Sequence, residues 1–396
     1  MKNRFLLLCA ALCGLFGAAK AQHQWVPQMS GTSAYLNCLA IVSADTVYVS
    51  AETGAVLKTV NGGNTWNQVG TGPISAMVFT TNLKGFGACS GEIIATQNGG
   101  ATWSSCYSNP NISEFWDIYF PDENNGYAAA WSVELANYVV KTSDAGATWD
   151  TLYKYDENFA LFNTIYFRDA LNGFVGCDNG ILLKTTNGGT NFTPISVFTN
   201  SAINTIFFPT ADTGYLATDN SIFSTINGGD NWSQLSFSFP GIIYSIHFIN
   251  ANRGFAVGGT GMGSMSLYET SNAGNTWTQS ATGTQTLSAV AFADTMPGYA
   301  VGSNGIILKY SKASGIEDSE TPINISISPN PAVDFIEITS DKEIFYEIYS
   351  AEGALINTGV LKSGSSKMAL NGYSGGLYIV KYKTDKGIGN NKFIKL

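Results

Sequence analysis

Charged side chains and histidine are scarce in this chain of 396 residues. Only 12% of its residues are charged and two are histidine, whereas roughly 25% of residues are charged in an average soluble domain. Lys, Arg, Glu and Gln are few, while Gly, Asn, Thr and Ser abound, which excludes a helix-rich protein. The aromatic content of 13% excludes a disordered chain, which would be poor in aromatic residues.

Long apolar runs are absent after the first residues. Residues 5–18 are apolar or small, follow two basic residues and precede a small-x-small triplet at 19–21. This pattern predicts an export signal peptide over 1–21. No later segment approaches the roughly 18 apolar residues of a membrane-spanning helix, so no transmembrane segment is expected.

Basic residues are fewer than acidic ones. The chain carries 20 Lys and Arg against 29 Asp and Glu, a net charge of −9. Residues 22–315 hold 9 of the basic and 19 of the acidic residues. An acidic surface repels phosphate groups, so binding to nucleic acid and docking on acidic membranes are both disfavoured.

Cysteine is rare. Four cysteines follow the predicted signal peptide: Cys38, Cys89, Cys106 and Cys177. An exported chain can oxidise them in any of three pairings, and four isolated buried thiols are the alternative; the sequence leaves both open. None belongs to a C-x-x-C pair, so a zinc site built on cysteine is not supported.

A six-residue motif of the type NGGNTW recurs six times between residues 61 and 277, at spacings of 37 to 46 residues. A period of about 40–50 residues with strand-like content is typical of a β-propeller. The Asn-Gly-Gly part predicts a tight hairpin turn, and the aromatic residue after it predicts a wedge between sheets. The motifs begin and end at Asn61 and Trp66, Asn98 and Trp103, Asp144 and Trp149, Asn187 and Phe192, Asn227 and Trp232, and Asn272 and Trp277.

Seven similar apolar runs, each expected as the first strand of a blade, begin near residues 36, 74, 115, 162, 203, 243 and 287. The seventh unit ends near residue 315 without the motif and its aromatic residue. Trp25 precedes Trp66 by 41 residues, which is one period. We therefore predict a seven-bladed propeller over 22–315 in which the strand at Trp25 completes the last blade and closes the ring.

A second module follows the propeller. Residues 316–322 are expected to form a polar linker, and 323–396 contain alternating runs of five to eight residues separated by turn signals. Such a pattern predicts a small immunoglobulin-like β-sandwich. The predicted fold class is all-β: a seven-bladed β-propeller with a C-terminal immunoglobulin-like β-sandwich.

The NGGNTW-type motif resembles the Asp-box of the bacterial neuraminidase repeat, and the blade pattern resembles the propeller family named for a photosystem II assembly factor. The resemblance implies that the six motifs are structural hairpins away from any active face. It implies a fold but no single function, since such propellers serve sialidases, other glycosidases, sorting receptors and assembly factors.

The C-terminal module resembles the type A sorting domain of the type IX secretion system of Bacteroidota. The similarity rests on the motifs at 328–331, 348–353, 375–380 and 392–396, which occur in the family's order. It implies that residues 323–396 engage the type IX secretion machinery. It also implies that the protein is either released or attached to the outer-membrane surface.

Few catalytic sets can be assembled from this sequence. Sialidases hold the substrate carboxylate with three arginines, and residues 22–315 contain only Arg168 and Arg253, so sialidase activity is excluded. His247 falls in a column of first-strand aromatic residues and is expected as a packed ring. One usable histidine supports neither a Ser-His-Asp triad nor a histidine zinc site, and no catalytic residue is assigned.

Candidate ligand-binding residues lie in predicted loops. Glu52, Asp178 and Asp219 hold matched positions between second and third strands, where they form either a solvated acidic rim or one that binds calcium or a glycan. Trp131 lies in an inserted loop, and Tyr153 and Tyr155 lie in the loop that follows; exposed rings there would stack on sugars. Trp116 lies within a first strand, so core packing is expected for it.

The sequence favours a secreted or cell-surface, non-catalytic propeller that binds an extracellular glycan or protein. One alternative is a secreted glycan-cleaving enzyme that uses an acidic pair on the propeller face. Another is an extracellular assembly or scaffold factor, which the photosystem family suggests.

Overall fold

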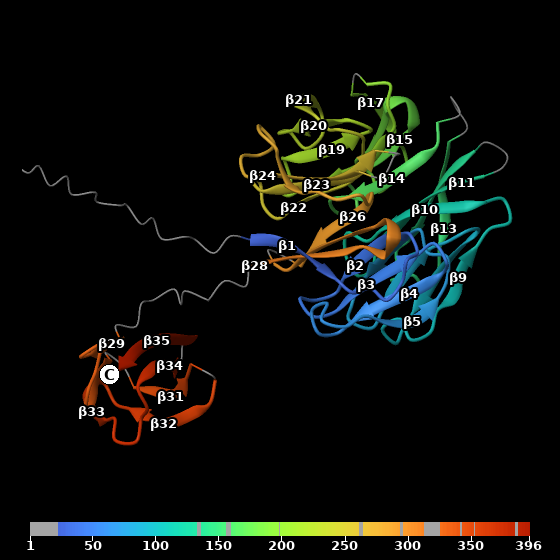
Figure 1. The fold of residues 1–396 in the computed structure, drawn as a ribbon. Helices are drawn as coiled ribbons and strands as arrows, with labels where there is room; N and C mark the ends of the chain where they lie inside the picture. The colour runs from blue at the N-terminus through green and yellow to red at the C-terminus, as the bar shows by residue number, and fades with distance from the viewer. Residues whose placement is uncertain are drawn as a thin grey trace, which may run out of the picture. The chain divides into compact units, whose positions relative to one another are not determined.

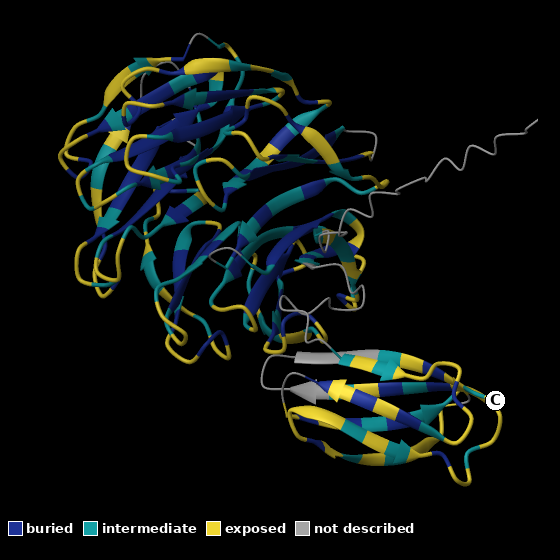
Figure 2. Cartoon of the chain, turned by 90° about the vertical axis from the view of Figure 1, so that its left-hand side faces the viewer, coloured by how far each residue is buried: buried dark blue, intermediate teal, exposed yellow. Residues whose placement is uncertain are grey.

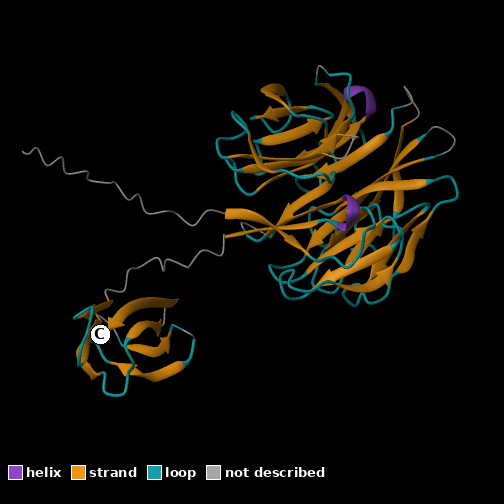
Figure 3. Cartoon of the chain, in the orientation of Figure 1, coloured by secondary structure: helices purple, strands orange, loops and turns teal. Residues whose placement is uncertain are grey.

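The computed structural model describes residues 23–396 except 133–135, 156–159, 198, 261–263, 294–295, 313–324, 341–342, 352 and 385–386. The predicted signal peptide and linker therefore lie outside the described residues. All regular elements that are described are strands, apart from two short 3-10 turns, η1 (Asp178–Gly180) and η2 (Ser303–Gly305) (Figure 3). The all-β prediction is confirmed.

The described chain forms two compact units, one over Gln24–Ser311 and one that contains the strands from Ile325 onward (Figure 1). The first unit consists of seven four-stranded sheets. Its strands are β1 (His23–Gln28), β2 (Leu36–Ile41), β3 (Val47–Ala51), β4 (Ala55–Thr59), β5 (Asn67–Thr71), β6 (Ala76–Phe79), β7 (Gly85–Ala88), β8 (Glu92–Thr96), β9 (Ser104–Ser108), β10 (Glu114–Tyr119), β11 (Gly126–Trp131), β12 (Asn137–Thr142), β13 (Asp150–Tyr155), β14 (Phe162–Phe167), β15 (Gly173–Cys177), β16 (Ile181–Thr185), β17 (Thr193–Ser196), β18 (Ile203–Phe207), β19 (Gly214–Thr218), β20 (Ser221–Thr225), β21 (Ser233–Ser238), β22 (Ile242–Phe248), β23 (Gly254–Thr260), β24 (Ser264–Thr270), β25 (Thr278–Ala281), β26 (Leu287–Phe292), β27 (Gly298–Gly302) and β28 (Ile307–Lys312).

Six of the sheets are meanders of four consecutive strands, and the seventh has the order β1-β28-β27-β26. The strand that contains Trp25 thus completes the last blade, as predicted. The inner strands β2, β6, β10, β14, β18, β22 and β26 each contact the next, and β26 contacts β2. This arrangement closes the ring, so the edges that remain are those of the outermost strand of each blade.

Aromatic stacks hold neighbouring blades together. Tyr48 stacks on Phe79 of the next blade with ring centroids 4.2 Å apart, and Tyr127 stacks on Phe167 at 3.5 Å. Close packing at these stacks requires glycine, because a Cβ at Gly173 would lie 2.5 Å from the Phe167 ring. Buried residues accordingly follow the strands while exposed residues gather in the loops (Figure 2).

Six hairpin turns between third and fourth strands share one hydrogen-bond pattern. In the first, the Gly63 N–H donates to Thr59 Oγ1 at 2.9 Å and the Thr65 N–H donates to Asn61 Oδ1 at 3.0 Å. The equivalent pair of bonds recurs in the other five turns. Such side-chain acceptors satisfy turn N–H groups that the ladder leaves free.

The second unit is a β-sandwich of two antiparallel sheets. Its core includes Ile336, Ile348, Val380 and Phe393. One sheet has the order β29-β30-β33 and the other β32-β31-β34-β35. The strands are β29 (Ile325–Ser328), β30 (Phe335–Ser340), β31 (Ile344–Ser350), β32 (Leu355–Leu361), β33 (Gly364–Ala369), β34 (Gly376–Thr384) and β35 (Gly387–Lys395). The predicted sandwich is confirmed.

Candidate ligand-binding face

The propeller has two chemically different ends. Loops between first and second strands, and the six hairpin turns between third and fourth strands, lie at one end, which we call the turn end. Loops between second and third strands, and the connections from blade to blade, lie at the other, which we call the crossover end. Loops at the ends of a rigid propeller are where binding residues usually lie.

Six inner strands carry a β-bulge close to the crossover end. In β10, Phe115 pairs with Ala130 and Asp117 pairs with Ala129, so Trp116 between them has no partner residue. Ser75 occupies the equivalent place just before β6, by alignment of the seven runs. The residues at this position are Asn37, Ser75, Trp116, Asn163, Asn204, Tyr244 and Ser288, and we call them the bulge ring.

Two members of the bulge ring are large and exposed. Trp116 is 44% exposed and Tyr244 is 39% exposed, whereas the other five members are asparagine or serine. The prediction that Trp116 packs in the core is wrong, because the bulge turns its side chain out of the alternation of the strand. Bulges re-aim side chains in this way and are frequent beside functional sites.

Tyr35 joins the bulge ring to the loops of the first blade. Its hydroxyl lies near Ser288, Tyr244 and Glu52, and its burial raises the pKa of the phenol above its usual value. The Tyr35 N–H donates to Glu52 Oε1 at 3.1 Å. A cluster of aromatic and acidic groups therefore spans the sixth, seventh and first blades.

Carboxylates at the crossover end hold members of the bulge ring in place. Glu114 accepts hydrogen bonds from Ser75 Oγ at 3.0 Å and from Ser90 Oγ at 2.6 Å. Asp178 in η1 accepts one from Asn163 Nδ2 at 2.8 Å.

Asp219, between β19 and β20, accepts a longer hydrogen bond of 3.4 Å from Asn204 Nδ2. The three acidic residues named from the sequence, Glu52, Asp178 and Asp219, therefore all lie at this end.

Asp117 follows Trp116 directly on β10 and contacts the next inner strand. Its carboxylate accepts hydrogen bonds from Thr164 Oγ1 at 3.0 Å and from the N–H groups of Ile165 and Ile118, both at 2.9 Å. Burial outweighs these bonds and raises the pKa of Asp117 to about 6. The carboxyl group of Asp117 is thus expected to titrate in mildly acidic solution.

His247 lies further along the inner strands from the bulge ring. Its ring packs on Phe207, with centroids 4.5 Å apart, and on Phe292 at 5.6 Å. Burial lowers the pKa of the imidazole to about 4. The prediction that His247 is a packed ring is confirmed.

The aromatic residues selected from the third-blade loops are placed differently from the prediction. β13 continues through Tyr155, which pairs with Asn137 and is only 6% exposed. Tyr153 packs against Phe192 with centroids 4.9 Å apart, and Trp131, which ends β11, is half-buried. The prediction of Tyr155 as an exposed stacking residue is wrong, because the strand extends into the segment that was expected to be a loop.

The four cysteines are free thiols, so the interpretation without disulfides holds. Burial raises the pKa of Cys38 and Cys106 to about 11 and that of Cys89 to about 12. Within the described ranges, no three His, Cys, Asp or Glu side chains gather as a metal site. In the same ranges, no helix is long and apolar enough to cross a membrane.

Residues 326–396 match the family described as the secretion system C-terminal sorting domain. The C-terminal unit is a type IX sorting domain. Its presence implies export and a secreted or cell-surface location for the chain. No curated protein matches the sequence.

The propeller is similar to several solved structures. YCF48 from Cyanidioschyzon merolae is 18% identical, with a TM-score of 0.59 over 74% of this chain and 100% of that one. A structure titled YCF48 bound to D1 peptide is 17% identical, with a TM-score of 0.59 over 74% and 98%. PorZ of Porphyromonas gingivalis, a surface component of its type IX secretion system, is 14% identical, with a TM-score of 0.52 over 90% and 59%. These similarities show the propeller fold.

Proposed function

We propose that this protein is an exported, non-catalytic binding propeller whose crossover end is the ligand face. The observation that carries the proposal is the exposure of the Trp116 and Tyr244 rings on bulges of the innermost strands. Large aromatic rings on a rigid scaffold offer wide contact area at a small entropic cost. The type IX sorting domain accounts for delivery to the extracellular side.

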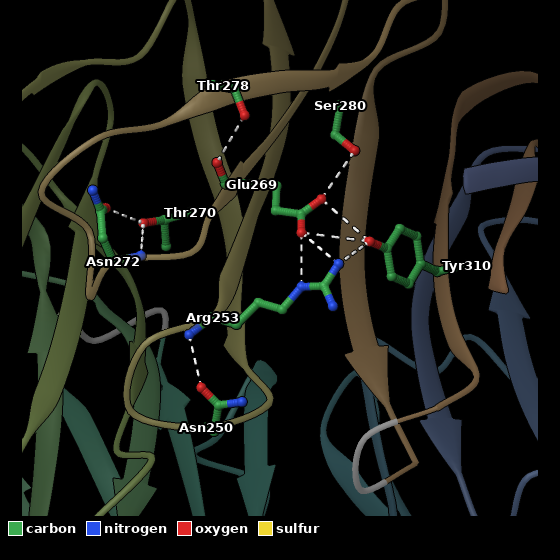
Figure 4. A network of polar contacts seen from close by, with 8 residues as sticks. All are labelled: Asn250, Arg253, Glu269, Thr270, Asn272, Thr278, Ser280 and Tyr310. Carbon is green, nitrogen blue, oxygen red and sulfur yellow. Dashed lines mark hydrogen bonds and ion pairs between the residues drawn. The ribbon is translucent and has the colours of Figure 1, made fainter. Parts of the chain in front are cut away.

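The arginines of the propeller support a non-catalytic role. Arg168 donates to the carbonyl of Ala211 in the next blade. Arg253 pairs with Glu269 at 2.6 Å and donates to the hydroxyl of Tyr310 (Figure 4). Both guanidinium groups are thus engaged between blades at the turn end, away from the bulge ring.

Asp117 favours a second candidate, a secreted glycan-cleaving enzyme. Glycosidases need two carboxyl groups beside the scissile bond, and a general acid requires a raised pKa. Asp117 has a raised pKa. The described carboxylate closest to it in sequence, Glu114, is held by two serine hydroxyls. An assembly or scaffold role is the remaining alternative, and the neighbour titled YCF48 bound to D1 peptide supports a protein ligand for it.

The whole exported chain, applied to panels of glycans and peptides with and without calcium, tests the proposal. Retention without release of reducing ends is expected. Retention of the ligand should be lost in the Trp116→Ala and Tyr244→Ala variants. It should be kept in the control variant Ile226→Ala, because Ile226 is 83% exposed but lies at the turn end. Release of reducing ends would overturn the non-catalytic assignment and favour the enzyme.

A further inference from the structure

Basic side chains of the propeller are concentrated at the turn end. Lys309 donates to the carbonyl of Gly62 at 2.6 Å, and Lys58 donates to that of Gly99 at 3.1 Å. Each of these bonds joins one blade to the hairpin turn of the next. The basic residues with described side chains at this end are Lys58, Lys84, Lys141, Arg168, Lys184, Arg253 and Lys309.

Basic side chains that the structure describes are almost absent from the crossover end. Among the described side chains of the propeller, its single basic residue is Lys154, on the outermost strand β13 of its blade. Its acidic residues include Glu52, Glu92, Glu114, Asp178 and Asp219. Acidic groups gathered without nearby cations create a negative potential, which attracts cations to this face and repels anions.

Asp117 places a carboxyl group on the inner strand beside the bulge ring. Its carboxylate accepts hydrogen bonds from the Thr164 hydroxyl and from two backbone N–H groups. The described basic residues form their ion pairs elsewhere, Lys184 with Asp230 and Arg253 with Glu269. Among the described side chains, no basic group therefore forms an ion pair with Asp117.

The exposed rings next to these acids fit the same type of ligand. The face of an indole or phenol ring attracts an ammonium or guanidinium group. Trp116 lies two residues from Glu114 and one from Asp117, and Tyr244 lies near Tyr35, whose N–H donates to Glu52. Carboxylates thus flank Trp116 along β10, and Tyr35 joins Tyr244 to Glu52, so acidic groups accompany both exposed rings on this end.

We propose that the bulge ring binds a lysine- or arginine-bearing segment of a protein partner, whose positive group lies over Trp116 beside Glu114 or over Tyr244 beside the Tyr35–Glu52 pair. This inference rests on the crossover end being the ligand face and adds the chemical class of the ligand. A neutral glycan would use the same rings but would gain nothing from the charge of this end. Charge complementarity of this kind sets specificity and the rate of association.

Tetralysine tests the inference when the full chain is titrated by calorimetry at 50 mM and 300 mM salt. Tetralysine should bind, and both acetylation of its ammonium groups and the higher salt should weaken binding. Trp116→Ala, Tyr244→Ala and Glu114→Gln should each weaken binding by about fivefold or more. The matched turn-end variants Ile226→Ala and Glu123→Gln should bind as the parent chain does.

Equal binding of acetylated and unmodified tetralysine, or an equal loss in the turn-end variants, would overturn the inference. The melting temperature of each variant separates loss of the site from loss of the fold. If cellotetraose binds in a manner sensitive to Trp116→Ala and tetralysine does not bind, the cationic-ligand inference fails while the binding propeller stands. If no probe responds to Trp116→Ala or Tyr244→Ala, the ligand face is also misplaced.

Discussion

Trp25, on the first described strand, packs against Tyr310 on the last strand of the propeller, with ring centroids 4.8 Å apart. The indole also meets Phe255 and Phe292 edge-on. These contacts join the two ends of the propeller sequence within one sheet, so the stability of the ring depends on β1.

Trp25→Ala should therefore destabilise the whole propeller cooperatively, by about 3 kcal/mol. Chemical denaturation followed by tryptophan fluorescence measures this loss for the propeller alone, because all eight tryptophans lie within Gln24–Ser311. Trp116→Ala is the matched control and should cost less than about 1 kcal/mol, since that ring is exposed. An equal loss of unfolding free energy in the two variants would contradict closure of the ring through Trp25.

Tyr155→Ala distinguishes a core residue from a ligand-binding one. Tyr155 packs against Phe162 with centroids 5.8 Å apart and belongs to a buried cluster. Its loss should lower the free energy of unfolding by about 3 kcal/mol, and ligand binding by the folded fraction should be unchanged. If the Tyr155→Ala variant were as stable as the parent but did not bind ligand, Tyr155 would belong to the ligand site instead.

The architecture was predictable because each blade repeats a local pattern. The turn residues around Asn61, the aromatic residue at Trp66 and the first-strand runs recur with one period, and Trp25 fits that period. The sequence therefore indicates both the number of blades and the closing strand. The packing of Tyr48 on Phe79 across blades follows from that repetition.

The exposed site was harder to predict. A bulge adds one residue to a strand, so Trp116 leaves the core face although it lies within an apolar run. When the seven first-strand runs are aligned, Trp116 and Tyr244 fall at the same position as Asn163 and Asn204. Polar residues at that position were the available sign that it faces away from the core. The prediction for Tyr155 was wrong because β13 is longer than expected. Tyr155 pairs with Asn137 inside the sheet and does not lie in a loop.

The four thiols should resist reagents in the folded protein. Burial raises the pKa of Cys38, Cys89 and Cys106 above its usual value, and the thiolate is the reactive form. An alkylating reagent at pH 8 should label these residues slowly in buffer and fully in denaturant, without prior reduction. A requirement for a reductant in denaturant would show a disulfide and contradict the free thiols.

Asp117→Asn should change how stability depends on pH. The pKa of Asp117 is about 6 in the folded chain against 3.8 for an exposed aspartate, so between these values the folded state holds a proton that the unfolded state has lost. Stability therefore falls as pH rises from about 4 to about 6. The Asn variant should gain about 3 kcal/mol relative to the parent between pH 3.5 and pH 7. A constant difference between the two proteins would contradict a buried, titrating Asp117.

His247→Phe should change the pH dependence in the opposite direction. The imidazole has a pKa of about 4 in the folded chain against 6.5 for an exposed histidine, so between these values the unfolded state binds the extra proton. Stability therefore rises as pH increases from about 4 to about 6.5 and is lost on acidification. The Phe variant keeps a ring against Phe207 but has no group to protonate there. Its free energy of unfolding should therefore fall by about 3 kcal/mol less than that of the parent on acidification.

The contributions of Asp117 and His247 overlap and oppose each other in the parent chain. Denaturation curves at pH 4, 5, 6 and 7 should thus show a weak pH dependence in the parent. The two single variants should show slopes of opposite sign, since each retains only one of the titrating groups. Slopes of the same sign would mean that one of the two groups does not titrate as a buried residue.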